Sequence, residues 1–380
     1  MKVAHIIPDL GVKSGGPSRS VLNTVEGIRA RKVDADILTY DCLDNPNIAE
    51  GNYIRTVPYT QRLPFAYNYH YKDLFRTKIY DIYHIHSIYS YPTYYAPSYA
   101  KAHKKPYIIT PRGSLYEQTM QYSHVKKWLY IKCVLLSQLN HAAAIQATCE
   151  QEMLEIRKLG VRAPIAIIPN PINVPSVIPA PINHSKMRIG FLGRIHPKKN
   201  IDGLLKAWAL AGFGQRQDVE LVIIGECNPN DMEYLHSLYS LQNRFGITNI
   251  NWAGAKFGQE KQQMIQTLSY LIMPSFSENF GMVVPEALIC GVPVLASKYA
   301  PWRILEDQKC GWWIDITPES IADALVQLLD VSEASRVEMG RIGQKLVIEN
   351  YTQSVIADKL ILLYKWLLGI EKRPDFIYND

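Results

Sequence analysis

The chain has 380 residues, more than one hydrophobic core usually supports, so the sequence predicts two domains. Hydrophobic residues make up 47% and charged residues 20%, a balance that is typical of globular proteins and excludes a mainly disordered chain. The net charge of +6 is uneven, since residues 1–185 carry 21 Lys and Arg against 13 Asp and Glu, while residues 186–380 carry 20 against 22.

Two features of the sequence bear on its compartment. The six cysteines show no spacing typical of a metal site or a redox pair, which favours a reducing environment. The apolar run at 3–7 is too short for a signal peptide, and no stretch reaches the roughly 20 apolar residues of a spanning helix. We therefore expect a cytoplasmic protein.

The first predicted unit is a strand at 3–7, a glycine-rich turn at 11–17 and an amphipathic helix. Gly15 and Gly16 would let the backbone of this turn approach a phosphate, although a turn of this kind can also be only a turn. Further on, Asp34 and Asp36 have the spacing of a metal-binding carboxylate pair, but they lead directly into an apolar strand. We interpret them as the polar start of that strand and predict no metal site.

Strands alternating with helical segments continue through the first half and favour a mostly parallel sheet. In such sheets the functional residues lie just beyond the carboxyl ends of the strands. His84 and His86 end one strand on the same side, with His86 nearer the edge, and Arg112 follows the next strand. His86 is thus a candidate, although a single histidine is more often structural, and Arg112 could bind an anionic donor or acceptor group. The strands predicted after the first two lie at 54–57, 81–84, 107–110, 143–147 and 165–168.

The second half begins after a proline-rich segment at 175–186, which we interpret as a linker. A strand at 187–192 leads into a loop in which Arg194 and Lys199 could neutralise a departing diphosphate without a metal, with Lys198 as the adjacent alternative. The alternative interpretation is an ordinary basic loop. The remaining strands are predicted at 220–225, 250–254, 270–273, 292–296 and 312–314.

The stretch 274–288 reads as a strand end, a turn of small residues and the start of a helix. If Phe280 or Gly281 opens that helix, its unpaired amides lie between Glu278 and Glu286, which would be roughly 12 Å apart along a helix. Pro285 is compatible with a first helical turn. An anionic phosphate would bind at this tip, and the simpler alternative is a capped helix with an exposed glutamate. The residues predicted to form the tip are Asn279, Phe280, Gly281 and Met282.

This stretch resembles the Glu-(seven residues)-Glu signature of the retaining GT-B glycosyltransferases of family 4, and the loop at 193–199 resembles their Gly-Arg-(four residues)-Lys motif. The resemblance implies that Glu278 contacts the donor sugar, that Glu286 contacts the nucleotide ribose, and that Arg194 and Lys199 hold the distal phosphate. It also implies that the further donor contacts come from Gly15, Gly16, His86, Trp252 and Ala253. The sequence departs from the family pattern at two places, where the family's contacts cannot be assigned directly. Arg112 stands where many relatives have histidine, and residues 170–173 lack the usual Asn-Gly-Val-Asp.

The resemblance predicts a GT-B fold, in which two Rossmann-like α/β domains face a cleft. We expect an N-terminal acceptor-side domain at 1–174, the linker at 175–186, a donor-binding domain at 187–355, and a C-terminal helix at 356–380 that crosses back to the first domain.

The predicted activity is retaining, metal-independent transfer from a UDP-sugar or GDP-sugar to a hydroxyl of a glycan, with no cofactor. Residues 111–115 and 300–302 resemble a bacterial surface-polysaccharide subset, so capsule, exopolysaccharide or lipopolysaccharide synthesis with a lipid-linked acceptor is expected. The alternatives are a nucleotide-sugar epimerase or phosphorylase of the same fold, or a non-catalytic nucleotide-sugar-binding subunit. The basic, tyrosine-rich first half could contact the inner face of the cytoplasmic membrane, or be simply a solvated surface; no nucleic acid is expected.

Overall fold

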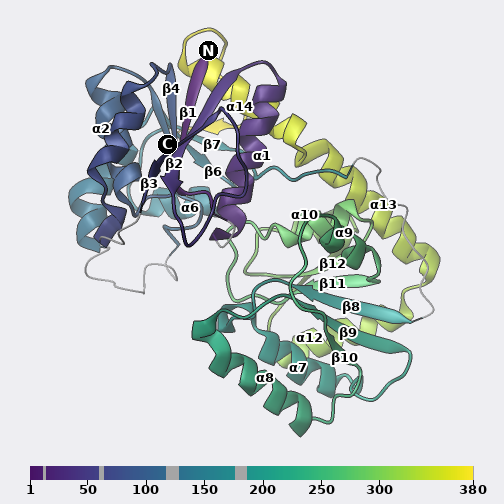
Figure 1. Cartoon of the computed structure of the whole chain (residues 1–380). Coiled ribbons are helices and arrows are strands. Elements are labelled where there is room, and N and C mark those ends of the chain that lie inside the picture. Colours follow the sequence, from purple (N-terminus) through teal and green to yellow (C-terminus); the bar gives the residue numbers. More distant parts are fainter. Residues whose placement is uncertain (12–13, 60–63, 117–127, 176–185, 380) are drawn as a thin grey trace. The chain divides into compact units, whose positions relative to one another are not determined.

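The structure, a computed structural model, describes residues 1–11, 14–59, 64–116, 128–175 and 186–379 (Figure 1). The chain forms two compact units: Met1–Asn173 together with Tyr351–Asp380, and Val174–Asn350. The expected linker at 175–186 lies almost entirely outside the described residues. Within the part of the chain that is described, no helix is both long and apolar enough to span a bilayer.

The first unit is built on a sheet in which eight strands are described, in the order β14-β7-β6-β5-β4-β1-β2-β3. All the strands predicted from the first half are present, and their pairing is parallel. The short β14, which the sequence analysis did not predict, pairs antiparallel with β7. The strands are β1 (Lys2–Asp9), β2 (Asp34–Asp41), β3 (Ile54–Pro58), β4 (Ile82–His86), β5 (Tyr107–Thr110), β6 (Ala144–Ala147), β7 (Ile165–Ile167) and β14 (Ile377–Tyr378).

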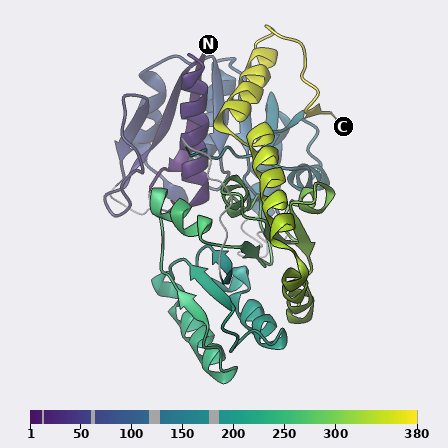
Figure 2. The same ribbon diagram turned by 90° about the vertical axis from the view of Figure 1, so that its right-hand side faces the viewer.

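Helices cover both faces of this sheet. On one face, α1 (Gly16–Ala30) and the C-terminal α14 (Gln353–Leu367) share an apolar core with the strands. Figures 1 and 2 show α14 lying beside α1, where the Arg31 guanidinium binds the Asp358 carboxylate at 2.7 Å. The other face packs against a separate core. The helical segments on this second side are η2 (Pro64–Ala66), η3 (Tyr69–Arg76), α2 (Tyr91–Ala102), η4 (Ile131–Leu135), α5 (Leu136–Asn140) and α6 (Glu150–Lys158).

The second unit has a fully parallel sheet in which six strands are described, in the order β10-β9-β8-β11-β12-β13. Each strand was predicted from the sequence to within one or two residues at its ends. The strands are β8 (Met187–Leu192), β9 (Val219–Ile224), β10 (Ile250–Trp252), β11 (Tyr270–Met273), β12 (Val294–Ser297) and β13 (Gly311–Ile314).

The helices of the second unit form two layers (Figure 1). Three of them, α7 (Ile201–Leu210), α8 (Met232–Arg244) and α12 (Pro318–Gln327), bury apolar side chains against one face of the sheet. On the other side, α10 (Val283–Ile289) packs on α13 (Glu333–Asn350), where a side chain on Gly340 would collide with the Gly291 carbonyl. The remaining helical segments are η5 (Pro197–Lys199), η6 (Pro229–Asp231), α9 (Gly258–Gln266), α11 (Ile304–Asp307) and η7 (Leu328–Asp330).

Each sheet has one place where the strand order reverses direction. In the first unit the chain runs from β1 outward to β2 and β3, and then returns to β4 on the other side of β1. In the second unit it runs from β8 to β9 and β10, and returns to β11. At such a switch point the loops after the two central strands diverge, which leaves room for a ligand at their carboxyl ends. Most candidate residues of the sequence analysis follow the central strands β1, β4, β8 and β11 or the neighbouring β5, whereas Trp252 and Ala253 lie at the end of the edge strand β10.

Candidate functional site

In the second unit, the loops after β8 and β11 lie side by side because the two strands are neighbours. The Phe276 amide donates to the Lys198 carbonyl at 3.0 Å and joins the two loops directly. The basic loop and the paired-glutamate stretch, which are about 80 positions apart in sequence, therefore form one surface at the switch point.

Both glutamates are ion-paired to lysines in this surface. The Lys199 ammonium donates to the Glu278 carboxylate, and both side chains are mostly buried, with 21% and 14% of their surface exposed. Glu286 accepts from Lys261 on α9 at 2.6 Å. Sequence reasoning brought Lys199 and Glu278 to the same site, but it missed Lys261. Charge-assisted bonds of this kind are roughly twice as strong as neutral ones, so each carboxylate is held in place.

Positive charge is concentrated around Glu278. Burial, together with the nearby Lys199 and Arg194 cations, lowers the pKa of Lys198, and Glu278 acts in the opposite direction. Arg194 is exposed at the start of the loop that follows β8. Three cations around one carboxylate leave a net positive charge, which suits a diphosphate.

The predicted helix start is corrected by the structure. The helix α10 begins at Val283 and not at Phe280 or Gly281, so the spacing estimated from helical rise does not apply between Glu278 and Glu286. Gly281 has φ of +76°, and a side chain there would meet Met273 at 3.0 Å, so the chain turns sharply before the helix. The amides of Val284 and Glu286 are already bonded to the Gly281 and Met282 carbonyls.

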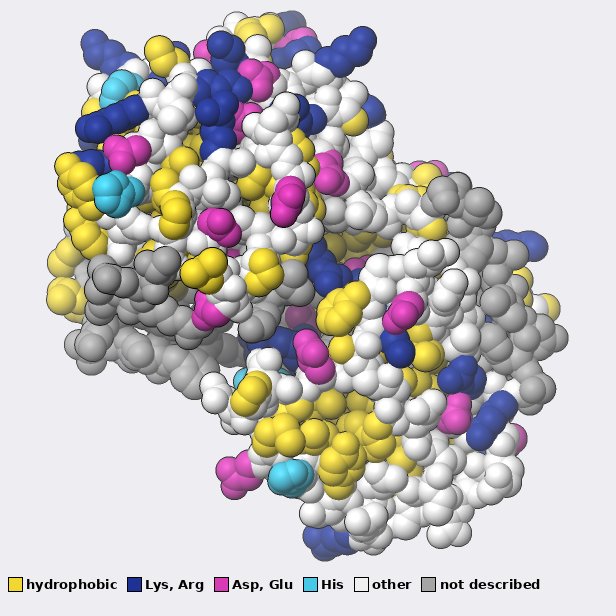
Figure 3. Space-filling view, viewed as in Figure 1, with side chains coloured by type: hydrophobic (Ala, Val, Ile, Leu, Met, Phe, Trp, Pro, Cys, Tyr) yellow, Lys and Arg dark blue, Asp and Glu magenta, His cyan; other side chains and the backbone are white. Residues whose placement is uncertain are grey.

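The other predicted donor contacts of the second unit are placed in different ways. Phe280 is buried and packs on Trp302, whose indole N–H donates to the Phe280 carbonyl, so its side chain belongs to the core. Trp252 ends the edge strand β10, where its indole donates to Gln242 at 3.0 Å. The Ala253 amide donates to the Ile223 carbonyl, so it is already used in the sheet. In Figure 3, hydrophobic side chains gather near α8 on the face of the second unit that is turned to the viewer.

In the first unit, the loops after β1, β4 and β5 surround a cavity of about 250 Å³. Asp9 shapes its glycine-rich wall, since its carboxylate accepts from the Gly11 amide and the Ser14 hydroxyl, both at 2.6 Å. Gly15, with φ of +72°, and Gly16 then start α1, which has no side-chain cap and no acidic residue in its first turn. The cavity is lined by Ile7, Pro8, Asp9, Ser14, Pro17, Ser18, His86, Ser87, Arg112 and Ser114.

Arg112 lies in the cavity wall and bonds to neutral groups. Its Nη1 donates to the Asn170 side-chain oxygen at 2.7 Å and to the Ser20 hydroxyl at 3.1 Å, and its Nη2 donates to His86 Nδ1 at 3.1 Å. Its Nε is buried and has no hydrogen-bond partner among the described residues. Burial lowers the pKa of Arg112 to about 10, against the raising effect of Glu152, so the guanidinium stays charged at neutral pH.

The backbone at this edge is unusual. Arg112 has φ of +54° and Ser87 has φ of +76°, although neither is glycine. Such conformations cost about 1–3 kcal/mol and persist where the surrounding structure holds them. At Arg112 the turn is held by Glu152, whose carboxylate accepts from the Gly113 amide at 2.6 Å and from the Thr148 amide at 2.7 Å. Two consecutive strand ends therefore hold strained residues at the same cavity.

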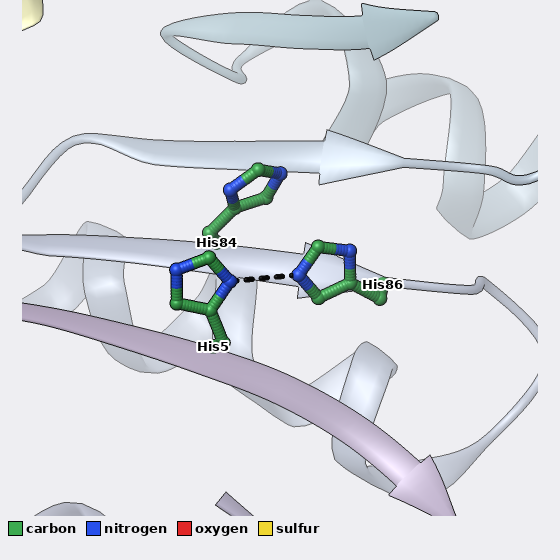
Figure 4. A group of neighbouring side chains, drawn as sticks. All are labelled: His5, His84 and His86. Carbon is green, nitrogen blue, oxygen red and sulfur yellow. Dashed lines mark hydrogen bonds between the residues drawn. The ribbon is translucent and has the colours of Figure 1, made fainter. Parts of the chain in front are cut away.

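His86 belongs to a buried group with His5 and His84 (Figure 4). The register explains the grouping, since His5 pairs with His84 across β1 and β4 and His86 lies two residues further along β4. His5 Nδ1 lies 3.0 Å from His86 Nε2, and the rings of His84 and His86 stack at 4.4 Å. Among the described residues, these three form the one group whose geometry would suit a metal ion. Asp34 and Asp36 are instead bonded to Lys78.

Several residues of these two surfaces carried no signal that sequence reasoning could use. Asp9 is two residues beyond the apolar run at 3–7, His5 looks like a strand residue, and Lys261 is one of many helical lysines. Asn170 stands in a motif that departs from the family pattern, yet its side chain holds Arg112. Tertiary pairing alone reveals their roles.

Two family models match consecutive parts of the chain. The model of a glycosyl transferase 4-like domain matches residues 15–171, and that of glycosyl transferases group 1 matches residues 178–346. Together they span most of the chain. The chain belongs to the group 1 glycosyltransferases. The expectation of this family and of its GT-B fold is thus confirmed.

Curated relatives of this glycosyltransferase match about half of it. Sucrose synthase 4 of Oryza sativa subsp. japonica is 26% identical over 224 residues, which cover 52% of this chain and 27% of that protein. Phosphatidyl-myo-inositol mannosyltransferase of Mycobacterium leprae is 32% identical over 209 residues, covering 52% of each. The matched stretches thus span only about a quarter to a half of these relatives.

Solved structures match the glycosyltransferase over nearly its whole length. Sucrose-phosphate synthase from Thermosynechococcus elongatus has a TM-score of 0.79 at 19% identity and covers 97% of this chain and 100% of its own. HepE from Anabaena, in complex with UDP-glucose, has a TM-score of 0.69 at 14% identity over 95% and 98%. WaaG, a glycosyltransferase involved in lipopolysaccharide biosynthesis, has a TM-score of 0.68 at 14% identity over 97% and 100%. At these identities the likeness establishes the fold alone.

Proposed function

We propose that this glycosyltransferase moves a sugar, with retention of configuration and without a metal ion, from a nucleoside diphosphate sugar to a hydroxyl of a lipid-linked glycan in surface-polysaccharide synthesis. The observation that carries the proposal is the pairing of Lys199 with Glu278 beside Arg194 and Lys198 at the switch point of the second unit. Fixed cations at this place would stabilise the negative charge that grows on the diphosphate as the glycosidic bond breaks.

Each partner of the ion pairs has a separate task in this proposal. The Glu278 carboxylate accepts hydrogen bonds from hydroxyls of the donor sugar. When the donor binds, Lys199 donates to the distal phosphate as well as to Glu278. Glu286, oriented by Lys261, accepts the ribose hydroxyls. The UDP complexes of HepE support a uridine donor, while the base and the sugar are left to experiment.

The proposed retention follows from the charge at the leaving group. The diphosphate, held by Arg194 and Lys199, can itself take the proton of the attacking hydroxyl on the face from which it departs. His86 and Arg112 of the first unit would bind an anionic group of a substrate at the cavity of that unit. No cofactor takes part in this scheme.

The first unit supplies the proposed membrane contact. Lys101 and Lys104 are exposed on α2 and the turn after it, and Trp128 exposes 54% of its surface. Figure 3 shows Lys and Arg side chains on the first unit near the top of the view. Basic side chains near an anionic surface contribute about 1 kcal/mol each, so we propose a peripheral, salt-sensitive contact with the inner leaflet. Sedimentation with vesicles of anionic and of neutral lipid tests this, and equal binding to both would contradict it.

The test of the activity is turnover by the purified protein with a panel of UDP- and GDP-sugars, offered lipid-linked glycans or free sugars as acceptors. Glu278→Ala should lose most turnover, whereas Lys345→Ala, which removes an exposed ion pair on α13, should keep it. Proton NMR of the product determines whether the anomeric configuration is retained, and a chelator tests independence from metal. Full turnover by Glu278→Ala would contradict the proposed site. Transfer to free sugars alone would contradict the glycan acceptor, and sugar conversion without any acceptor would favour an epimerase.

A further inference from the structure

The three buried histidines of the first unit form part of one continuous chain of hydrogen bonds. His86 Nδ1 faces Arg112 Nη2 at 3.1 Å, and His86 Nε2 faces His5 Nδ1 at 3.0 Å. His5 Nε2 lies 3.4 Å from the Tyr364 hydroxyl, which lies 2.7 Å from His84 Nδ1. All six ring nitrogens have a partner, since His84 Nε2 lies 2.8 Å from the hydroxyl of Thr110.

The chain ends on backbone beyond Thr110. Thr110 Oγ1 lies 3.2 Å from Gln146 Oε1, and Gln146 Nε2 donates to the Ile168 carbonyl at 2.8 Å. The register of the sheet brings these groups together, because Thr110 pairs with His86 across β4 and β5. Tyr364 reaches the chain from α14, the helix that returns from the end of the second unit.

The two ends determine the position of every proton between them. A guanidinium can only donate and a carbonyl can only accept. Each group must therefore donate to the next one along the chain, from Arg112 toward Ile168. His86 therefore accepts at Nδ1 and donates from Nε2 to His5 Nδ1, and His5 donates from Nε2 to the Tyr364 hydroxyl. Tyr364 in turn donates to His84 Nδ1, and His84 donates from Nε2 to Thr110. Every ring is then a neutral Nε2–H tautomer.

A second proton on His86 or His5 would place a donor against a donor, and one on His84 would leave the Tyr364 hydroxyl proton without its acceptor. On His86 it would face the Arg112 guanidinium, and on His5 it would face His86 Nε2–H. Burial and the Arg112 charge lower the pKa of His5 to about 3, and burial, together with the neighbouring histidines and Arg112, lowers the pKa of His84 and of His86. The other ionisable groups facing the chain are Tyr364 itself, Glu152 behind Arg112, and Asp9 across the cavity.

We propose that Tyr364, His5 and His84 are positioning residues that keep His86 neutral, with its Nδ1 lone pair directed at Arg112, so that the guanidinium is held at the cavity wall. The inference rests on the proposed function for its catalytic consequence, but the proton arrangement belongs to the resting protein. Metal binding by these rings would compete with this arrangement, because ligation needs nitrogens that are already hydrogen-bonded.

Histidine ¹⁵N NMR of the full chain tests the arrangement without any turnover. Long-range ¹H–¹⁵N correlations distinguish the two neutral tautomers and the charged ring. We expect three neutral Nε2–H histidines that do not change between about pH 8 and pH 5.5, because the chain opposes a second proton on each ring. The signal that Arg112→Lys perturbs most identifies His86, and the one that Thr110→Val perturbs most identifies His84. An Nδ1–H or charged His86, or a shift of all three signals on addition of Zn²⁺, would overturn the proposal.

Tyr364→Phe tests the catalytic consequence. Without the hydroxyl, His5 and His84 lose their shared partner, so the proton direction at His86 is no longer fixed and Arg112 can meet an N–H in place of a lone pair. We expect kcat/KM to fall about tenfold, which corresponds to the loss of one good hydrogen bond in the transition state. A new acidic limb should also appear in the pH profile, with activity lost as pH decreases toward 5.5.

The matched control is Tyr71→Phe. Tyr71 is also fully buried in the first unit and donates to the Leu38 carbonyl at 2.8 Å, so its loss costs a similar bond without touching the histidines. It should leave the pH profile and the tautomers unchanged. Thr110→Ser, which keeps the hydroxyl, should behave as wild type, while Thr110→Val should behave as Tyr364→Phe. An unchanged pH profile in Tyr364→Phe would contradict a positioning role. If the wild-type protein showed no turnover, only the proposed function would be contradicted.

Discussion

The two switch points of this glycosyltransferase use polar groups in opposite ways. In the second unit, charges are paired across loops: Lys199 with Glu278 and Lys261 with Glu286, with Arg194 exposed beside them. In the first unit, one cation, Arg112, contacts neutral acceptors that end a buried chain of neutral histidines. Ion pairs can exchange partners with an incoming anion, whereas a directed chain of neutral bonds can hold a geometry but cannot take up charge without breaking.

The largest expected effect separates chemistry from positioning. Lys199→Ala should lower kcat about 100- to 1,000-fold, the cost of removing one donor at a developing negative charge, with little change in KM. Arg112→Gln should act mainly on KM, because Arg112 would bind a group whose charge does not change in the reaction. Steady-state kinetics with the preferred donor measures both. A rise in KM for Lys199→Ala with kcat intact would erase the distinction between the two units.

The second effect concerns the stability of the first unit against pH. The folded-state pKa of His5 is about 3, against an ordinary value of 6.5, so between these values the unfolded chain binds a proton that the folded chain does not. Stability should therefore be complete above pH 6.5 and be lost as pH decreases, by about 2 kcal/mol for His5 alone at pH 5. Urea unfolding at several pH values, monitored by hydrogen exchange of the β1 and β4 amides, measures this loss of stability. His5→Gln should make the free energy of unfolding depend less steeply on pH. His236→Gln, which changes an exposed histidine, should leave this pH dependence unchanged.

The third effect is smaller and concerns the second glutamate. Lys261→Ala should raise KM for the donor about tenfold with kcat preserved, because Glu286 loses the bond that orients it toward the ribose. Lys345→Ala removes an exposed pair on α13 and should change KM by less than about twofold. If the donor were bound equally well by Lys261→Ala, Glu286 would not need its partner.

The smallest effect uses salt to contrast the two units. Raising NaCl from about 50 to about 500 mM should weaken nucleoside diphosphate binding several-fold, because screening shortens the range of the cations around Glu278. The same change should leave the histidine tautomer signals of the first unit unaltered. Calorimetry and NMR on one sample measure both. Salt-sensitive tautomers would indicate that the histidine chain is open to solvent.

Sequence periodicity was sufficient for the two sheets, because alternation of apolar strands with helices dictates a parallel arrangement whose strand ends collect at one edge. The strand-end rule also placed His86 and Arg112 at one edge of the first sheet, whereas the family resemblance, and not periodicity, placed Glu278 with Lys199. The helix start was wrong, because Gly281 adopts a left-handed turn that delays α10 to Val283. Local pattern does not encode that turn.

Only the tertiary structure decided which partner each polar group has. Lys261 reaches Glu286 across 25 positions and Tyr364 reaches His84 across 280, distances over which no periodicity carries information. The sequence by itself determined the elements, since local patterning and strand ends depend on neighbouring residues. The charge state and proton direction of the histidines depend on burial and on both ends of a chain drawn from four strands, the turn after β5, the residue after β7 and a returning helix, and these exist only once the molecule has folded.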